Sequence, residues 1–327
     1  MEKENNLFSR EASAWFRGIA ILMVILSHYA QWWSWFHVEE GFRELVRLAL
    51  SKMGPYGVAI FFLFSGYGLA KSAGKERITF YFVIRRLINV YIPYLIIVFL
   101  IETLSGGFES SRDFLRILHG QDFWYMTVIF LFYIGFIIIW FAVKNNHMRM
   151  LLLCLFLYGC NYMLKEGGKQ DFWYLSNWAF PIGVGSAVYE EKIEAVWHKA
   201  GVVFTLVFAA ATVWVVYSGL FTVHSWTSLE EEILYKTWAV VIFTVFIAAI
   251  ASWGLKYDPI LQFAGKYSLY FYLTHTFIFM AVVNTLEIDF GLRFAVASLA
   301  IITVSLLLGK SIDYLCKILM RIMQNKE

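Results

Sequence analysis

The chain has few charged residues, few prolines and little cysteine. Only 16% of its 327 residues are Asp, Glu, Lys or Arg, which is below the usual share of a soluble domain. Two of its three cysteines, Cys154 and Cys160, share one apolar run at a spacing that points them to different helix faces, and Cys316 lies far away. We therefore expect no disulfide framework and no metal site. The net charge of +3 gives no sign of nucleic-acid binding.

Apolar residues are abundant instead. They make up 60% of the chain, which indicates an integral membrane protein. The apolar runs predict an all-α, polytopic helical bundle of about ten transmembrane helices, in a single domain over residues 1–327. The predicted spans are 14–36, 54–71, 84–102, 123–143, 148–164, 172–189, 200–221, 233–253, 264–284 and 292–316. The first run is too long for a signal-peptide core, so we expect it to remain as a span.

The distribution of positive charge predicts how the bundle is oriented. Segments on the side that holds both termini carry twice as many Lys and Arg residues as segments on the other side. By the positive-inside rule, both termini are expected in the cytoplasm of a multi-pass protein of the inner or plasma membrane. Pro93 and Pro181 fall within predicted spans, where they indicate either ordinary kinks or breaks that shape a cavity.

Two ionisable residues in the first span are the strongest functional signal, because charge inside a membrane is costly. Arg17 and His28 are separated by about three helical turns and a rise of roughly 16 Å, so they lie on nearly the same helix face. His275 is expected at a similar depth in the ninth predicted span. Each histidine is either a general base for a reaction on a hydroxyl or a hydrogen-bonding contact between helices.

A basic cluster joins the second and third predicted spans. It contains Lys71, Lys75, Arg77, Arg85 and Arg86. The lysines fit a positive-inside signal lying over anionic lipid. Arg85 and Arg86 lead directly into an apolar run, and guanidinium groups at a helix entrance suit phosphates in bidentate geometry, so we interpret these two as binding residues.

Aromatic residues gather at the proposed outer ends of the spans. The string QDFWY occurs at 121–125 and again at 170–174, and different residues follow each copy, so no internal duplication is inferred. An interfacial aromatic belt explains most of these residues. Amide and carboxylate groups beside aromatic faces also suit sugar hydroxyls and ring C–H groups, which makes Trp124 and Tyr125 candidate contacts for a carbohydrate.

Five ordered segments resemble the integral membrane acyltransferase-3 family, whose members mostly O-acetylate sugars and cell-envelope polymers with acyl-CoA. The resemblance covers nearly the whole chain. The segments are WFRGIAILMVILSHY at 15–29, IFFLFSGYGLAKS at 60–72, RRLINVYIPYL at 85–95, FWYMTVIFLFY at 123–133 and GKYSLYFYLTHTFI at 265–278. The chain is similar to the stand-alone form of the family, without an esterase-like domain.

The resemblance implies a role for each matching residue. His28 would be the catalytic histidine, Arg17 a contact for the CoA moiety of acetyl-CoA, and Arg85 and Arg86 part of the phosphate site. Family members often carry a second arginine three residues after the first in this span, where this chain has Asn89 after Arg86. His275 would be a further catalytic group that stabilises the carbonyl oxygen, a role that a tyrosine also fits. The acceptor would be a hydroxyl of a sugar or cell-envelope glycan.

Two further alternatives remain open from the sequence. His28 either takes the proton from the acceptor hydroxyl or becomes acylated and passes the group on. The chain as a whole also fits a proton-coupled carrier or flippase for a glycan or small metabolite, because ten spans, kinked helices and midplane histidines describe such carriers too. A carrier predicts a coupling carboxylate deep within a span, whereas the acidic residues here mostly lie at span ends and in loops.

Overall fold

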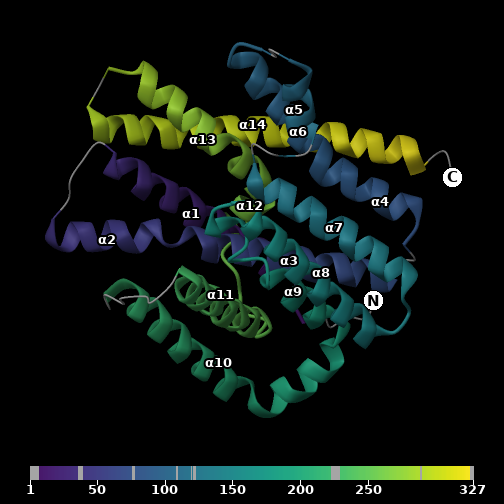
Figure 1. Cartoon of the computed structure of the whole chain (residues 1–327). Helices are drawn as coiled ribbons and strands as arrows, with labels where there is room; N and C mark the ends of the chain where they lie inside the picture. Colours follow the sequence, from purple (N-terminus) through teal and green to yellow (C-terminus); the bar gives the residue numbers. More distant parts are fainter. Residues whose placement is uncertain are drawn as a thin grey trace. The chain divides into compact units, whose positions relative to one another are not determined.

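The computed structural model describes residues 7–35, 40–75, 78–107, 110–118, 120, 123–221, 229–287 and 289–324. Regular structure in these ranges is helical throughout, so the prediction of an all-α polytopic helical bundle is confirmed. The elements are α1 (Arg10–Ser34), α2 (Gly41–Ser51), α3 (Gly54–Lys75), α4 (Phe80–Arg86), η1 (Leu87–Tyr91), α5 (Ile92–Leu104), α6 (Ser111–Leu118), α7 (Trp124–Ala142), α8 (Asn146–Glu166), η2 (Asp171–Trp173), α9 (Ala179–Val188), α10 (Glu190–Phe221), α11 (Leu229–Ala251), α12 (Pro259–Lys266), α13 (Ser268–Thr285) and α14 (Phe290–Gln324) (Figure 1).

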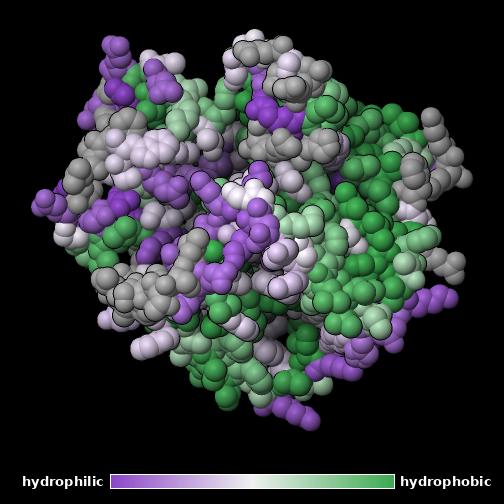
Figure 2. All heavy atoms as spheres, viewed as in Figure 1, coloured by the Kyte–Doolittle hydropathy of each residue, from purple (hydrophilic) through white to green (hydrophobic). Residues whose placement is uncertain are grey.

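Eight helical stretches among the described residues are long and apolar enough to cross a membrane. Each of them overlaps one predicted span. The two other predicted spans contain α13 and the short helix α9. Large apolar side chains on these helices are exposed, including Leu155 on α8 and Leu206 on α10, and Figure 2 shows apolar surface gathered over both helices. Such surface fits a lipid-facing protein.

The predicted span over 172–189 is wrong in its first half. The chain there forms the short 3-10 helix η2 and turns, and α9 begins only at Ala179. Two side chains link this segment to other parts of unit 1: Ser176 donates to the carbonyl of Pro55 at 2.7 Å, and Asn177 donates to Asn161 at 2.7 Å. Pro181 therefore lies in the first turn of a helix, where its missing N–H is tolerated, and does not kink a continuous one.

The chain divides into two compact units. Unit 1 comprises Met1–Lys75 and Leu131–Gly265, and unit 2 comprises Glu76–Phe130 and Lys266–Glu327. Unit 1 contains α1, α3, α9, α10 and α11 among its helices, and unit 2 contains α4, α5, α13 and α14.

In unit 1, α3 packs against α1 and α9 through close backbone approaches at glycines. A side-chain carbon at Gly183 of α9 would lie 1.9 Å from the carbonyl oxygen of Leu63, and one at Gly66 of α3 would lie 2.3 Å from that of Phe180. The two glycines thus serve the same contact from opposite sides. Membrane helices, which gain little from apolar burial against each other, associate by such close packing of small residues.

In unit 2, α13 packs along α14 and hydrogen bonds link the two helices. The buried hydroxyls of Thr274 and Ser305 lie 2.6 Å apart, and the Tyr270 hydroxyl donates to Asp313 at 2.6 Å. The π-helical turn η1 precedes Pro93 at the start of α5. Widening the helix there accommodates the proline ring and the carbonyl four residues before it.

Candidate active site

Helix α1 carries Arg17 and His28 at the two ends of a buried stripe. Between them on the same face lie Ile21 and Val24, whose side chains are 1% and 3% exposed. Leu22 and Leu26, on another face, are more than 40% exposed. Arg17 and His28 are both half-buried. The face that bears the two ionisable groups is therefore the packed face of α1, as expected of functional residues within a membrane.

His28 is positioned by aromatic stacking and by the helix end on which it lies. Its ring stacks on Trp32, one turn later, with centroids 5.5 Å apart and an interplanar angle of 17°. The adjacent Ser27 is buried, and its hydroxyl donates to the carbonyl of Ser51 at 2.7 Å. A side-chain carbon at Gly54 would come within 3.0 Å of the Ser27 hydroxyl. These contacts tie the His28 end of α1 to the junction of α2 and α3.

Arg17 lies where α1 meets α12. Its Nε donates to the carbonyl of Ser13 at 3.0 Å. One residue later, Gly18 faces the backbone of Leu261, and Gly265 faces Ala14 at a distance that leaves no room for a side chain. Tyr257 packs against Trp15 with centroids 5.5 Å apart, and burial raises the pKa of the Tyr257 phenol, so its hydroxyl stays protonated. The first turns of α1 are thus fixed by backbone contact.

Arg85 and Arg86 end α4 in unit 2, directly before the π-helical turn η1. Thr79 caps this helix by accepting from the Phe82 N–H at 3.2 Å, and the Arg86 guanidinium lies over the Phe82 ring, 5.6 Å from its centroid. Both arginines are half-buried, while Asn89 is exposed. Both guanidinium groups are thus positioned at the end of a capped helix.

Another member of the basic cluster has a partner inside unit 1. Lys71, on α3, forms an ion pair with Glu190 at the start of α10. The same carboxylate accepts from the Tyr67 hydroxyl at 2.7 Å and from the Leu7 N–H at 2.6 Å. Lys71 therefore contributes to a structural network. Arg77 lies outside the described residues, as does the side chain of Lys75.

His275 lies on α13 and is 2% exposed. Its Nδ1 lies 2.7 Å from the carbonyl of Tyr272 and 3.1 Å from that of Phe271. A nitrogen between two carbonyl acceptors carries the proton, which leaves Nε2 as the basic nitrogen of the neutral ring. Thr276 lies 3.3 Å from that Nε2. The local geometry thus defines one tautomer of His275.

Tyr125 belongs to an aromatic cluster next to His275 within unit 2. Its ring contacts Tyr272 with centroids 5.3 Å apart, and Tyr272 in turn lies 6.0 Å from His275. Trp124 stands perpendicular to Tyr125 at 6.3 Å. The structure therefore brings Trp124, Tyr125 and His275 to one region. Gln121 and Asp122, the polar half of this QDFWY string, lie outside the described residues.

The second QDFWY string makes structural contacts. Asp171 forms an ion pair with Lys236 of α11 at 2.9 Å, and Lys236 also pairs with Glu232. Lys169 lies over the ring of Trp173, 4.7 Å from its centroid. Sequence reasoning missed Lys236 and Glu190 as partners because both pairs join residues far apart in the chain.

The candidate residues divide between the two units. Arg17 and His28 belong to unit 1, and Arg85, Arg86, Trp124, Tyr125 and His275 belong to unit 2. Within the ranges that the structure describes, no three His, Cys, Asp or Glu side chains are grouped so that they could hold a metal ion.

A protein-family model described as an acyltransferase domain matches residues 11–310, which include every candidate residue named above. No curated protein and no solved structure matches the chain. The matched region extends over nearly all of the helices that are long and apolar enough to cross a membrane. The chain therefore belongs to the acyltransferase-3 family of membrane acyltransferases.

Proposed function

We propose that the protein transfers an acyl group, in the first instance acetyl from cytoplasmic acetyl-CoA, to a hydroxyl of a sugar or cell-envelope glycan. Family membership supports acyl transfer in general. The observation that carries the finer proposal is the packed face of α1, with Arg17 at one end and His28 at the other. An anion-binding group and a proton acceptor thus share one rigid element.

The spacing of the two residues suits an acyl-CoA. Eleven helical residues separate Arg17 and His28 by roughly 16 Å, a length similar to that of an extended pantetheine arm. A donor whose phosphates contact Arg17 would present its thioester near His28. On the family resemblance, Arg85 and Arg86 of unit 2 are proposed as phosphate-binding residues too. Binding energy from the remote nucleotide would then position the reacting carbonyl.

His28 would act as the general base. It would accept the proton of the acceptor hydroxyl while the hydroxyl oxygen forms a bond to the thioester carbonyl carbon. The carbon–sulfur bond breaks next, the ester is released, and the CoA thiolate takes up the proton. The Tyr125 hydroxyl is one candidate for stabilising the carbonyl oxygen; the neighbouring His275, whose Nδ1–H faces backbone carbonyls, would do so only in its protonated form, by donating through Nε2. Trp124 and Tyr125 would contact the carbohydrate.

The test is acetyl transfer by purified protein in lipid vesicles, with radiolabelled acetyl-CoA and a cell-envelope glycan extract. His28→Ala should abolish label in the glycan fraction, whereas the matched control His147→Ala should keep it. His147 is an exposed histidine on α8 whose Nδ1 lies 2.8 Å from the Tyr189 hydroxyl. Near-normal transfer by His28→Ala would refute the catalytic role of His28. Transport of a glycan that needs no acyl-CoA would favour a carrier.

A further inference from the structure

The indole of Trp32 lies against the ring of His28. The two rings are nearly parallel, with an interplanar angle of 17° and centroids 5.5 Å apart, which is the geometry of an offset stack. Trp32 is 4% exposed, whereas Trp35, which follows α1 directly, is 63% exposed. One ring face of the half-buried His28 is thus next to a buried aromatic surface.

Further contacts hold Trp32 and this end of α1 in place. The Tyr29 ring lies against the indole with centroids 5.7 Å apart, and the Trp32 carbonyl accepts from the Trp35 N–H at 3.1 Å where α1 ends. The buried Ser27 hydroxyl accepts from the Gln31 amide at 3.4 Å, in addition to its bond to the last residue of α2. The stack therefore lies at the end of α1 that is tied to the junction of α2 and α3.

Stacking on an indole matters for the charge of His28. In the proposed function, His28 takes the proton of the acceptor hydroxyl and is an imidazolium until the CoA thiolate takes that proton up. The face of an indole attracts a cation that lies within about 6 Å of the ring centroid, and the attraction grows where water is excluded. The neutral imidazole gains much less. The stack therefore favours the charged ring that forms during transfer over the neutral ring of the resting protein.

We propose that Trp32 is a positioning residue for acyl transfer, which fixes the plane of the His28 ring and stabilises its imidazolium form. This inference rests on the proposed function. The proton balance is unchanged: the proton passes from the acceptor hydroxyl to His28 and from there to the CoA thiolate, and Trp32 takes up none. An interaction made mainly with the charged state raises kcat and leaves the binding of acetyl-CoA unchanged.

Charged side chains on the helices that pack against α1 have partners of their own. On α2, Arg47 forms an ion pair with Glu44 at 2.6 Å. Lys52, between α2 and α3, donates to a backbone carbonyl of α10 at 2.6 Å, and Lys236 of α11 has its two acidic partners. All of these groups are unchanged in variants of Trp32, so a difference between such variants reports the indole.

The first measurement is steady-state acyl transfer by the full-length protein in lipid vesicles. Trp32→Leu, which removes the aromatic face, should lower kcat about tenfold and leave the KM for acetyl-CoA unchanged. Trp32→Phe keeps an aromatic face and should recover most of that loss. Trp35→Leu, which changes the exposed tryptophan, is the matched control and should alter neither constant. A raised KM with unchanged kcat in Trp32→Leu, or equal kcat values in Trp32→Leu and Trp32→Phe, would overturn the proposal.

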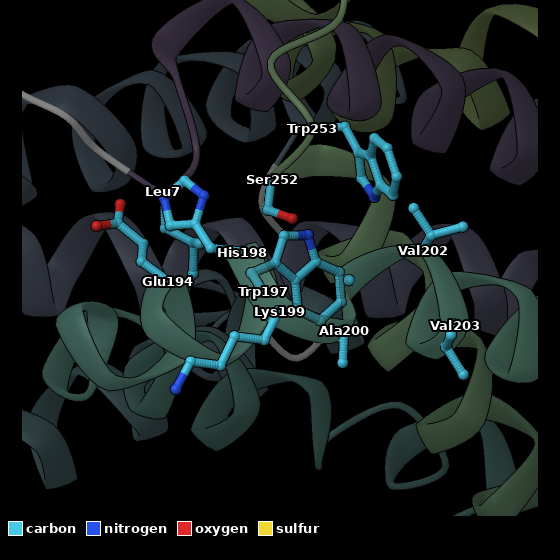
Figure 3. Close-up of a pocket in the computed structure, with 11 residues that line it drawn as sticks. Leu7, Glu194, Trp197, His198, Lys199, Ala200, Val202, Val203, Ser252 and Trp253 are labelled. Atoms are coloured by element: carbon cyan, nitrogen blue, oxygen red, sulfur yellow. The ribbon is translucent and has the colours of Figure 1, made fainter.

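The second measurement needs neither acyl transfer nor the leucine variant. A protonated imidazole quenches the emission of an indole stacked on it, so tryptophan emission should fall as the pH is lowered through the titration range of histidine. The same part of this decrease should be absent from His28→Gln and from Trp32→Phe. Another histidine, His198, lines a cavity at the start of α10 together with Trp197 (Figure 3). His198→Gln is therefore the matched control and should keep that part of the decrease.

The two measurements separate this inference from the proposed function. An inactive wild type that shows the His28-dependent quenching would refute the proposed function, and with it the catalytic part of this inference, while the stack stands. An active wild type whose emission titrates in the same way in His28→Gln would overturn the role of Trp32 alone. Loss of that quenching in Trp32→Phe, together with the lowered kcat of Trp32→Leu, would support the role.

Discussion

The contact between α3 and α9 predicts a large effect of a single methyl group. In Gly183→Ala, the added carbon would lie 1.9 Å from the Leu63 carbonyl oxygen and 3.0 Å from the Tyr67 nitrogen. An ordinary contact needs roughly 3.4 Å or more, so the two backbones must separate by about 1.5 Å. Both neighbours are backbone atoms and do not rotate away. Gly66, which faces Phe180 across the same contact, would lose its close approach as well.

Such overpacking costs about 1–3 kcal/mol of unfolding free energy. For a chain of this size, that corresponds to a decrease of several degrees in the thermal midpoint. The measurement is thermal unfolding in detergent, followed by the loss of the monodisperse peak in size-exclusion chromatography. Gly68→Ala is the matched control: it lies two residues after Gly66 on α3 with open space around its position, and alanine there should be neutral or raise stability by up to about 1 kcal/mol. Equal midpoints for Gly183→Ala and Gly68→Ala would refute the packing argument.

Three further predictions concern the charged groups. In steady-state kinetics, Arg17→Ala should raise the KM for acetyl-CoA about tenfold and leave the KM for the acceptor unchanged, because the lost contact is with the donor phosphates. The control is Arg10→Ala, which changes an exposed arginine on the same helix. Equal effects of Arg17→Ala on both substrates would contradict the assignment. Arg86→Ala should raise the donor KM in the same assay, and a change confined to the acceptor would count against a phosphate contact. Glu190→Gln should lower the thermal midpoint more than Glu191→Gln does, because it weakens three hydrogen bonds made to one carboxylate; identical midpoints would show that this network adds no stability.

The spans were predictable because apolar runs bounded by charge are a strong signal. The segment before α9 was mispredicted for a physical reason. Its residues are uncharged and rich in aromatic side chains, as at the end of a span, but Ser176 and Asn177 find side-chain and backbone partners that stabilise turns in place of a helix. The short helices α2 and α6 were missed since each is too short to span a membrane and lies in a predicted connection, and α12 was missed because it lies across the predicted start of the ninth span at residue 264.

Some features of the candidate site could be predicted from the sequence and others could not. Arg17 and His28 share a helix, so the number of residues per helical turn was enough to place them on one face. The burial of Ile21 and Val24, which lie between them, agrees with that placement. The partners of other polar residues were not predictable in this way. Asp171 pairs with Lys236, which is 65 residues away, and such pairings depend on tertiary packing that no local pattern encodes.

The placement of Arg17 and His28 on one helix also bears on which donors the protein would accept. Their separation is set by the covalent geometry of α1 and changes little when neighbouring helices move. A donor that contacts both must therefore carry its anionic groups and its reactive carbonyl at a fixed distance. A short thioester that lacks the nucleotide can reach His28 or Arg17 but not both, so it loses the positioning that remote binding supplies. On the proposed function, selectivity for a CoA thioester is thus a property of one helix, whereas the identity of the acceptor depends on the aromatic residues around Tyr125.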